Sequence, residues 1–311
     1  MRNAATDLVE ELVKIDKRVL AITADNRNES YERIMKKYPD QYIEYGIAEE
    51  NMLASSAGLA SCGKIPFLYT ITNFMSMHSY EFLRNDICIA AQNVKLLGRS
   101  AGLVSSSMGP THQGTEELGL LRPLPNLVTI TPSTPVMAKE AVRFAYEHEG
   151  PVYIRLEGRG EKEYYDDSFV FESGKTYPIK DGRDVAIISM GSIITEAVKA
   201  AEMLERDFGV SAAVLDVPTS EPIEKENVLY YIDKCRLICS LEEHSIKCGL
   251  GSVIAEIMAE NGARSRLLRI GLSGCVDICA DREGIRKHFG LDYCSVAKRI
   301  IHSLEGKTDG L

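Results

Sequence analysis

The sequence predicts an α/β protein of two domains, each a mainly parallel sheet flanked by helices. Short, uninterrupted apolar runs alternate with amphipathic stretches of helical length, and such runs are typical of parallel strands buried on both faces. The alternation stops over residues 158–182, which are rich in Gly, Asp, Glu, Lys and Tyr, and then resumes. A length of 311 residues suits two domains of about 150 residues each.

The first domain is expected over residues 1–165. Ser133-Thr134-Pro135 is typical of a helix start, with proline in the first turn. The helices and strands expected in this domain alternate along the chain: helix 4–15, strand 19–25, helix 48–61, strand 65–71, helix 77–91, strand 94–98, strand 127–131, helix 134–147 and strand 151–156.

A linker over residues 166–182 is expected to lead into the second domain, residues 183–311. Gly209 follows an amphipathic stretch and is typical of a helix end. The expected elements are strand 184–191, helix 192–207, strand 210–217, helix 223–232, strand 236–241, helix 251–261, strand 266–270 and helices 281–288 and 292–304.

Composition narrows the classes of partner and compartment. The chain is 45% hydrophobic and 26% charged, and its net charge of −9 argues against a nucleic-acid or anionic-membrane partner. No apolar run approaches the roughly 18 residues of a membrane span, and the first residues lack the apolar core of a signal peptide. A cytoplasmic location is therefore expected.

The eight cysteines include two pairs at a spacing of four residues, Cys235/Cys239 and Cys275/Cys279. The first pair flanks an apolar run that is typical of a buried strand, on which positions four apart are too distant to chelate one ion. We expect buried free thiols rather than metal ligands.

Glu49 is the first candidate for chemistry. Gly46 forms a turn that leads into a helix, and Glu49 lies in its first turn beside the apolar Met52 and Leu53. A buried carboxylate needs a hydrogen-bonding partner or a raised pKa. The alternative is that Glu49 is an ordinary acid at a helix start, stabilised by the helix dipole. Of the two neighbouring acids, Glu50 could equally be the solvated one.

His112 is the second candidate. It stands in the turn Gly109-Pro110-Thr111-His112-Gln113-Gly114, where proline fixes the backbone and the glycines permit a close approach by a ligand. A carboxylate and an imidazole on glycine-marked connections are a common arrangement of catalytic groups in α/β chains. The alternative is a solvated surface histidine.

Together these segments resemble the pyrimidine-binding half of transketolase-like, thiamine-diphosphate-dependent enzymes. Gly46-Ile47-Ala48-Glu49 resembles the segment that holds the catalytic glutamate in transketolases and 1-deoxyxylulose-5-phosphate synthases, and residues 109–113 are similar to the transketolase substrate-histidine motif. Residues 124–133 and Arg84-Asn85-Asp86 also fit this pattern. The resemblance covers most of residues 2–157 and continues more weakly through the second domain.

The resemblance implies a missing part. These enzymes carry a further domain with a Gly-Asp-Gly segment and a downstream Asn that hold the metal ion and the diphosphate, and this chain has no such pair. The chain therefore resembles the C-terminal subunit of a split transketolase. The partner chain would bind Mg²⁺ or Ca²⁺ and the diphosphate, and two copies of this chain would pair within a heterotetramer whose active sites lie at subunit interfaces.

The resemblance also implies the cofactor contacts. Glu49 would hydrogen-bond the N1′ nitrogen of the aminopyrimidine, Phe74 would stack on its ring, and Asp25 would face the thiamine. A core aromatic and a helix N-cap are the alternatives for Phe74 and Asp25. Ile22 and Ile47 could support the cofactor, but core packing is favoured for both.

Arg2 and Arg155 fall near family positions that bind a substrate phosphate. Two further positions depart from the family pattern. Met108 stands where family members usually carry an acid that contacts a substrate hydroxyl, and Ser100 stands near the position at which transketolases carry a phosphate-binding histidine. These departures point to a modified sugar as substrate.

The function implied is transfer of a two-carbon ketol unit from a ketose or ketose phosphate to an aldose. Alternatives are a subunit like 1-deoxyxylulose-5-phosphate synthase or like the beta subunit of 2-oxoacid dehydrogenases, and a non-catalytic scaffold or regulatory subunit. The second domain is expected to serve association and support, although Gly249-Leu250-Gly251-Ser252 could bind an anion where it opens a helix.

Overall fold

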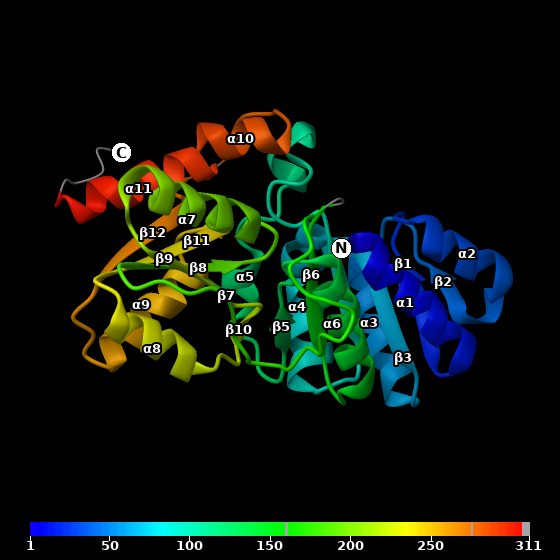
Figure 1. Ribbon diagram of the computed structural model, residues 1–311. Coiled ribbons are helices and arrows are strands. Elements are labelled where there is room, and N and C mark those ends of the chain that lie inside the picture. Colours follow the sequence, from blue (N-terminus) through cyan, green and yellow to red (C-terminus); the bar gives the residue numbers. More distant parts are fainter. Residues whose placement is uncertain (159–160, 275, 307–311) are drawn as a thin grey trace.

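The computed structural model describes residues 1–158, 161–274 and 276–306, and it contains two helix-flanked sheets side by side (Figure 1). The predicted α/β class is therefore confirmed. None of the helices in the described ranges combines the length and the hydrophobicity of a membrane-spanning segment.

The first sheet has seven strands in the order β10-β5-β6-β4-β3-β1-β2. All its pairings are parallel except that of β10, which is antiparallel to β5. The strands are β1 (Val19–Thr23), β2 (Tyr42–Glu44), β3 (Ile65–Ile71), β4 (Lys95–Arg99), β5 (Val128–Ile130), β6 (Val152–Leu156) and β10 (Thr219–Glu221).

The second sheet has five strands in the order β12-β11-β8-β9-β7. Its edge strand β7, which overlaps the end of the predicted linker, runs antiparallel to β9, and the other pairings are parallel. The strands are β7 (Tyr177–Lys180), β8 (Val185–Met190), β9 (Ala212–Asp216), β11 (Leu237–Ser245) and β12 (Arg266–Leu272).

Helices cover both faces of each sheet, and each sheet consequently separates two clusters of buried apolar side chains. The helices include α1 (Arg2–Ile15), α2 (Glu29–Lys37), α3 (Glu49–Ser61), α5 (Glu117–Leu121), α6 (Pro135–Glu147), α7 (Ile194–Phe208), α8 (Lys225–Lys234), α9 (Leu250–Glu260), α10 (Arg282–His288) and α11 (Tyr293–Leu304).

The helix expected over residues 77–91 differs from the prediction. The helical stretch begins before residue 77 and joins two π-helical segments, η2 (Phe74–His78) and η3 (Leu83–Ile89), through the short α4 (Tyr80–Phe82). The wider π turn is uncommon and often occurs at functional sites. The elements that were missed include α2, β2, α5 and β10, which are short or polar.

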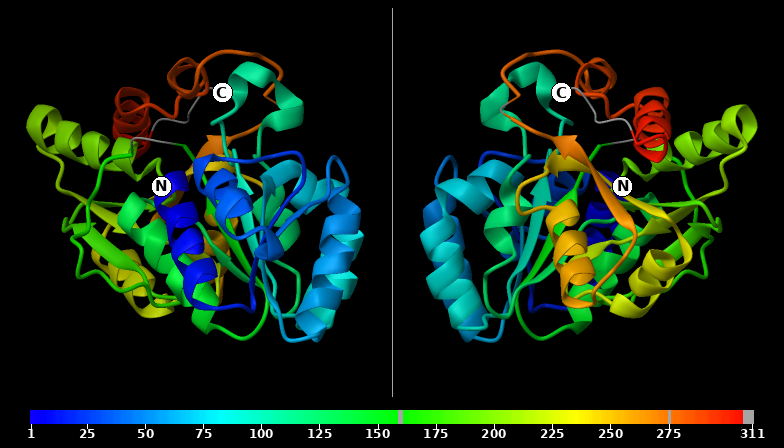
Figure 2. Two further views of the ribbon diagram at one scale, coloured as in Figure 1. Left: turned by 90° about the vertical axis from the view of Figure 1, so that its right-hand side faces the viewer. Right: turned by 90° about the vertical axis from the view of Figure 1, so that its left-hand side faces the viewer.

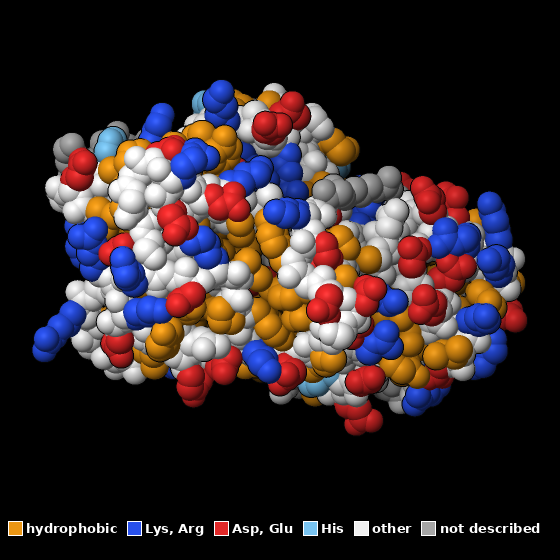
Figure 3. Space-filling view, in the orientation of Figure 1, with side chains coloured by type: hydrophobic (Ala, Val, Ile, Leu, Met, Phe, Trp, Pro, Cys, Tyr) orange, Lys and Arg blue, Asp and Glu red, His pale blue; other side chains and the backbone are white. Residues whose placement is uncertain are grey.

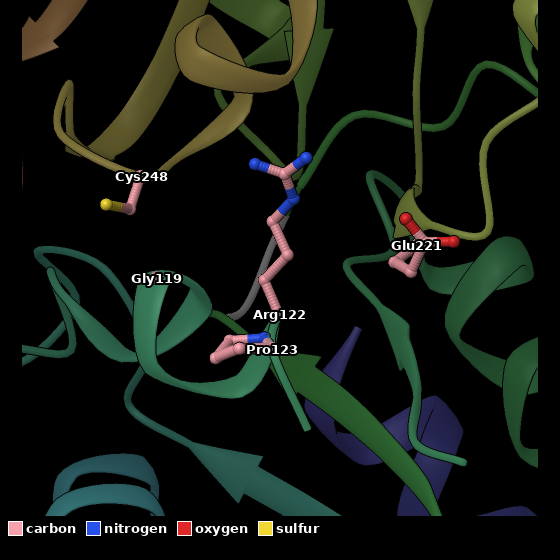
Figure 4. A pocket seen from close by; sticks show the side chains of 5 residues that line it. All are labelled: Gly119, Arg122, Pro123, Glu221 and Cys248. Atoms are coloured by element: carbon pink, nitrogen blue, oxygen red, sulfur yellow. The ribbon is translucent and has the colours of Figure 1, made fainter. Parts of the chain in front are cut away.

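Strand β10 joins the domains, because it follows β9 of the second sheet and adds to the edge of the first. Arg122 at the end of α5 crosses the same seam and forms an ion pair with Glu256 of α9. A cavity of about 490 Å³ opens beside it, where the Arg122 side chain lies between Cys248 and Glu221 (Figure 4).

Candidate functional site

The candidate residues gather at one edge of the first sheet. Strands β2, β1, β3 and β4 are parallel neighbours, so their carboxyl ends meet at the same edge. Shortly after these four ends the chain carries Glu49, Asp25, Phe74 and Ser100, respectively. This edge is where open α/β sheets bind ligands.

Glu49 is the first residue of α3 and is 3% exposed. Within the part of the chain that the structure describes, no hydrogen bond or ion pair engages its carboxyl group. Glu50, by contrast, is 44% exposed in its side chain and lies 3.4 Å from the Nε2 atom of His78. The predicted burial of Glu49 is confirmed, and Glu50 is the more solvated member of the pair.

Phe74 and His112 lie together, although they come from distant parts of the sequence. Their ring centroids are 5.4 Å apart and the rings meet edge to face at 76°. The Thr111 hydroxyl lies 2.8 Å from Nδ1 of His112 and so fixes the orientation of the imidazole. Helix α3 packs against η2, which places the Glu49 end of the helix on the same side of the sheet as Phe74.

Asn73 anchors the His112 turn. Its amide Nδ2 donates to the carbonyl of Gln113 at 2.8 Å and more weakly to that of Thr111 at 3.4 Å. Two buried polar atoms beside this anchor have no partner within the described chain, namely Oδ1 of Asn73 and Nε2 of Gln113. Buried polar atoms normally have hydrogen-bond partners. The lack of partners for these two atoms and for the Glu49 carboxyl group fits a site in which a bound ligand supplies the missing hydrogen bonds.

Asp25 is exposed, and its backbone has a positive φ of 47°. The structure adds a residue that was missed, Glu44 at the end of β2. Its carboxylate accepts from the backbone N–H groups of Asp25 at 2.8 Å and Gly46 at 3.0 Å. Burial raises the pKa of Glu44, but these bonds and those from Thr23 and Tyr42 outweigh it and lower the pKa overall. The sequence signal that could have identified Glu44 is an acidic residue at the end of a strand, two residues before the Gly46 turn.

Three expected substrate-binding residues differ in exposure. Ser100 follows β4, is 2% exposed and has a φ of 60°, whereas Met108 is 57% exposed on the loop that leads to His112. Arg2 is the first residue of α1 and is half-buried. Ile47, for which core packing was favoured, is 84% exposed, so that expectation was wrong; Ile22 is fully buried, as expected.

Arg155, expected to bind a substrate phosphate, is engaged by groups of the protein itself. It is 1% exposed, and each of its three guanidinium nitrogens donates to a protein acceptor. Nε donates to Glu117 at 2.5 Å and Nη1 to Glu157 at 2.6 Å, while Nη2 donates to the carbonyls of Gly114 and Glu243. The buried guanidinium therefore joins the two domains, and this position does not support direct contact with a substrate phosphate.

The ion pairs of Arg155 extend into the second domain. Arg282 of α10 donates to Glu157 and, at 2.9 Å, to Glu243, and Arg286 donates to Glu243 at 2.7 Å. Burial alone raises the pKa of Glu243, but the two arginines hold it at about 2. We call these residues, Arg155, Glu117, Glu157, Glu243, Arg282 and Arg286, the seam network.

The second domain also supports the His112 loop. The Ser106 hydroxyl donates to the carbonyl of Ala280 at 2.8 Å, and a Cβ added at Gly109 would lie 3.3 Å from the sulfur of Cys279. Figures 1 and 2 show this helical loop beside the segment that leads into α10.

The expected anion site at residues 249–252 is filled from within the chain. Glu242 accepts from the N–H groups of Leu250 at 2.7 Å and Gly251 at 2.9 Å, at the start of α9. Burial nevertheless raises the pKa of Glu242 to about 7. The helix terminus thus binds the chain's own carboxylate.

Cys235 and Cys239 are buried free thiols, as predicted, whereas Cys279 is an exposed free thiol. Its expected pair mate Cys275 lies outside the described residues. Among the described residues, no group of three or more His, Cys, Asp or Glu side chains is arranged to hold a metal ion.

Both parts of the chain match domains of known proteins. Residues 1–159 match the family described as the transketolase pyrimidine-binding domain, and residues 174–296 match the transketolase C-terminal domain. A solved structure described as a split gene transketolase, inactive beta4 tetramer, superimposes with a TM-score of 0.89 at 31% identity over 99% of both chains.

Relatives with similar sequences are also named as transketolase subunits. The chain is 34% identical to a subunit of the apulose-4-phosphate transketolase of Actinobacillus succinogenes, over 84% of each chain. It is 32% identical to the 6-deoxy-6-sulfo-D-fructose transketolase subunit of Clostridium sp., over 99% of this chain and 94% of that one. A 1-deoxy-D-xylulose-5-phosphate synthase of Parabacteroides distasonis is 33% identical over 93% of this chain, which spans only 46% of the synthase.

Proposed function

The chain belongs to the transketolase family, and we propose that it is the subunit of a split, thiamine-diphosphate-dependent transketolase that binds the pyrimidine ring of the cofactor. The assembled enzyme transfers a two-carbon ketol unit from a ketose or its phosphate to an aldose. The observation that carries the proposal is the buried Glu49 carboxyl group, which has no partner among the described residues and lies at the ligand-binding edge of the sheet.

Thiamine diphosphate, when bound, supplies the nucleophilic carbon that cleaves and re-forms the carbon–carbon bond. In our proposal Glu49 shares a proton with the N1′ nitrogen of the aminopyrimidine, which ends the burial of an unpartnered carboxyl group. Phe74 packs against the ring, and Asp25, held by Glu44, closes the thiamine side of the site. These roles rest on the shared edge and on the family pattern.

His112 is proposed to bind substrate. Its Nδ1 atom faces the Thr111 hydroxyl, which leaves Nε2 for a substrate oxygen. The exposed Met108 and the buried Ser100 line the approach along the same loop in this proposal, and Arg2 provides a cation near it. Because Met108 stands where the family usually carries an acid that contacts a substrate hydroxyl, we propose a modified sugar as donor, and the name of one relative refers to a sulfo-sugar.

A partner chain is part of the proposal. The relatives are named as subunits, and one solved relative is called a split gene transketolase. The partner would contribute the diphosphate-binding domain and the Mg²⁺ or Ca²⁺ ion, and two copies of this chain would form the centre of a heterotetramer.

A 1-deoxyxylulose-5-phosphate synthase activity is the second candidate, since the identity to one such synthase reaches 33%. The two candidates differ in their product. Product analysis of the reconstituted enzyme therefore separates them, since one candidate forms 1-deoxyxylulose 5-phosphate and the other forms a ketose extended by a two-carbon unit.

The test is reconstitution with the partner that co-purifies from the native host. The mixture should transfer a ketol unit only when thiamine diphosphate and a divalent cation are present, and this chain alone should be inactive. Ketol transfer by this chain without the partner, or activity of the mixture without thiamine diphosphate, would contradict the proposal.

A further inference from the structure

A polar cavity lies in the second domain, and none of the residues that line it takes part in the proposed reaction. It has a volume of about 990 Å³ and opens between β12, α10 and α11. Six of its lining side chains are basic or can become so: Arg269, Lys287, His288, Lys298, Arg299 and His302.

The charge of this cavity is unlike that of the others. Each of four further cavities combines its cations with at least one Asp or Glu side chain, whereas none of the described residues that line this one is acidic. Lys298 and Arg269 form no ion pair within the described ranges. Elsewhere acidic and basic side chains are intermixed, as Figure 3 shows for one face. A cluster of like charges in a protein of net charge −9 favours the binding of an anion.

The backbone arranges these cations around a common space. Ser295, Lys298, Arg299 and His302 recur at the spacing that places residues on one face of a helix, here α11. Arg269 approaches from β12, and its Nη1 atom donates to the carbonyl of Ile246 at 3.3 Å. The cations therefore come from separate elements and converge, which a solvated helix face alone would not achieve.

The cavity also has an apolar part, formed by Ile246 and by Phe289, whose ring meets that of His288 edge to face. Guanidinium and ammonium groups bind phosphate oxygens, and an apolar wall accommodates an organic ring or chain. The volume suits a ligand of nucleotide size.

We propose that this cavity binds a small organic polyphosphate, a molecule of the size and charge of a nucleoside diphosphate. The site lies in the second domain and shares no residue with the proposed cofactor and sugar contacts. A long polyanion is disfavoured, because the rest of the acidic protein surface would repel it.

The test is calorimetric titration of the full chain with ADP and, separately, inorganic pyrophosphate. Arg269→Gln combined with Lys298→Gln should weaken ADP binding at least tenfold. The matched control is Arg264→Gln with Lys225→Gln, which removes the same charges from exposed positions outside the cavity and should leave ADP binding unchanged. Both double variants should keep the thermal midpoint of the unliganded protein.

Stronger binding of ADP than of pyrophosphate would support the role of the apolar wall, whereas equal binding would overturn the organic part of the proposal. Equal losses in both double variants, or no ADP binding at millimolar concentration, would overturn the site itself. Tighter binding to duplex DNA or to phosphatidylserine vesicles, lost in the cavity variant, would show an extended polyanion surface instead.

Discussion

The seam network and the strand edge around Glu49 both bury acidic groups, but only the seam network supplies those groups with partners of opposite charge. At the seam every carboxylate faces an arginine from the same chain: Arg155 pairs with Glu117 and Glu157, and Arg282 with Glu157 and Glu243. At the strand edge, Glu49 has no such partner among the described residues.

The difference separates charges that hold the structure from a charge kept for a ligand. A buried ion pair stabilises only when both members are present, and the seam meets this condition within the chain. The burial of Glu49 instead costs free energy that a bound partner can offset. Substitutions of Arg155 and Glu49 test this distinction directly. Substitutions of Asp216, a buried acid outside both regions, and of Glu44 at the strand edge have smaller expected effects.

Arg155→Met should have the largest effect on stability. It leaves Glu117 buried without its counterion and leaves Glu157 paired with Arg282 alone, and breaking a buried pair in this way costs about 3–5 kcal/mol of unfolding free energy. Urea denaturation measures the loss. Arg143→Met, which removes an exposed cation paired with Glu140, is the control and should cost less than about 0.5 kcal/mol. Equal losses of unfolding free energy in the two variants would mean that the seam network does not stabilise the fold more than an exposed ion pair does.

Glu49→Gln should act on activity and spare stability. The amide keeps the shape but cannot exchange a proton, so the reconstituted enzyme should lose at least about 100-fold in kcat. Its urea midpoint should not fall, because an unpartnered buried carboxyl group contributes no ion pair. Glu50→Gln is the matched control, with turnover close to that of the unchanged protein. Near-normal turnover of the Glu49 variant would refute the proposed role of this residue.

Asp216→Asn should remove a pH dependence. Asp216 accepts hydrogen bonds from Ser133 and, at 2.7 Å, from Tyr165, but burial raises its pKa to about 7 from a usual value near 3.8. The folded state therefore binds the proton more tightly, so stability contributed by protonated Asp216 is full below about pH 4 and is lost as the pH rises toward 7 and above.

The slope of unfolding free energy against pH in that window should become less negative in the variant, by up to about 1.4 kcal/mol per pH unit. Urea denaturation between pH 4 and 8 measures it. Asp233→Asn, at an exposed position, should leave the slope unchanged. An unaltered slope in the Asp216 variant would show that this carboxyl group does not titrate in the window.

Glu44→Gln should have the smallest effect on stability, about 1 kcal/mol, since it weakens charge-assisted bonds to the N–H groups of Asp25 and Gly46 without removing their acceptor. If Glu44 positions the Asp25 loop for the cofactor, the KM for thiamine diphosphate should rise several-fold while kcat changes little. An unchanged KM would limit Glu44 to a local structural role.

The prediction of the fold succeeded where the signal was local. Strands such as β3 and β8 are uninterrupted apolar runs, and helices such as α6 carry a start signal. The short strand β10 gave no such signal, because it is paired only through a neighbour from the other domain. The π-helical turns that begin at Phe74 likewise depend on packing rather than on residue propensity.

The sequence by itself determined the α/β alternation, the family resemblance and the burial of Glu49 next to an apolar helix face. The tertiary structure decided that Arg155 forms hydrogen bonds to both domains and that Ile47 is exposed. It also decided that Glu44 accepts a hydrogen bond from the Asp25 backbone and that six basic side chains converge on one cavity. The physical reason is distance along the chain. A strand or helix pattern is set by neighbours in sequence, whereas the partner of a charge is set by residues such as 155 and 243 that only folding brings together.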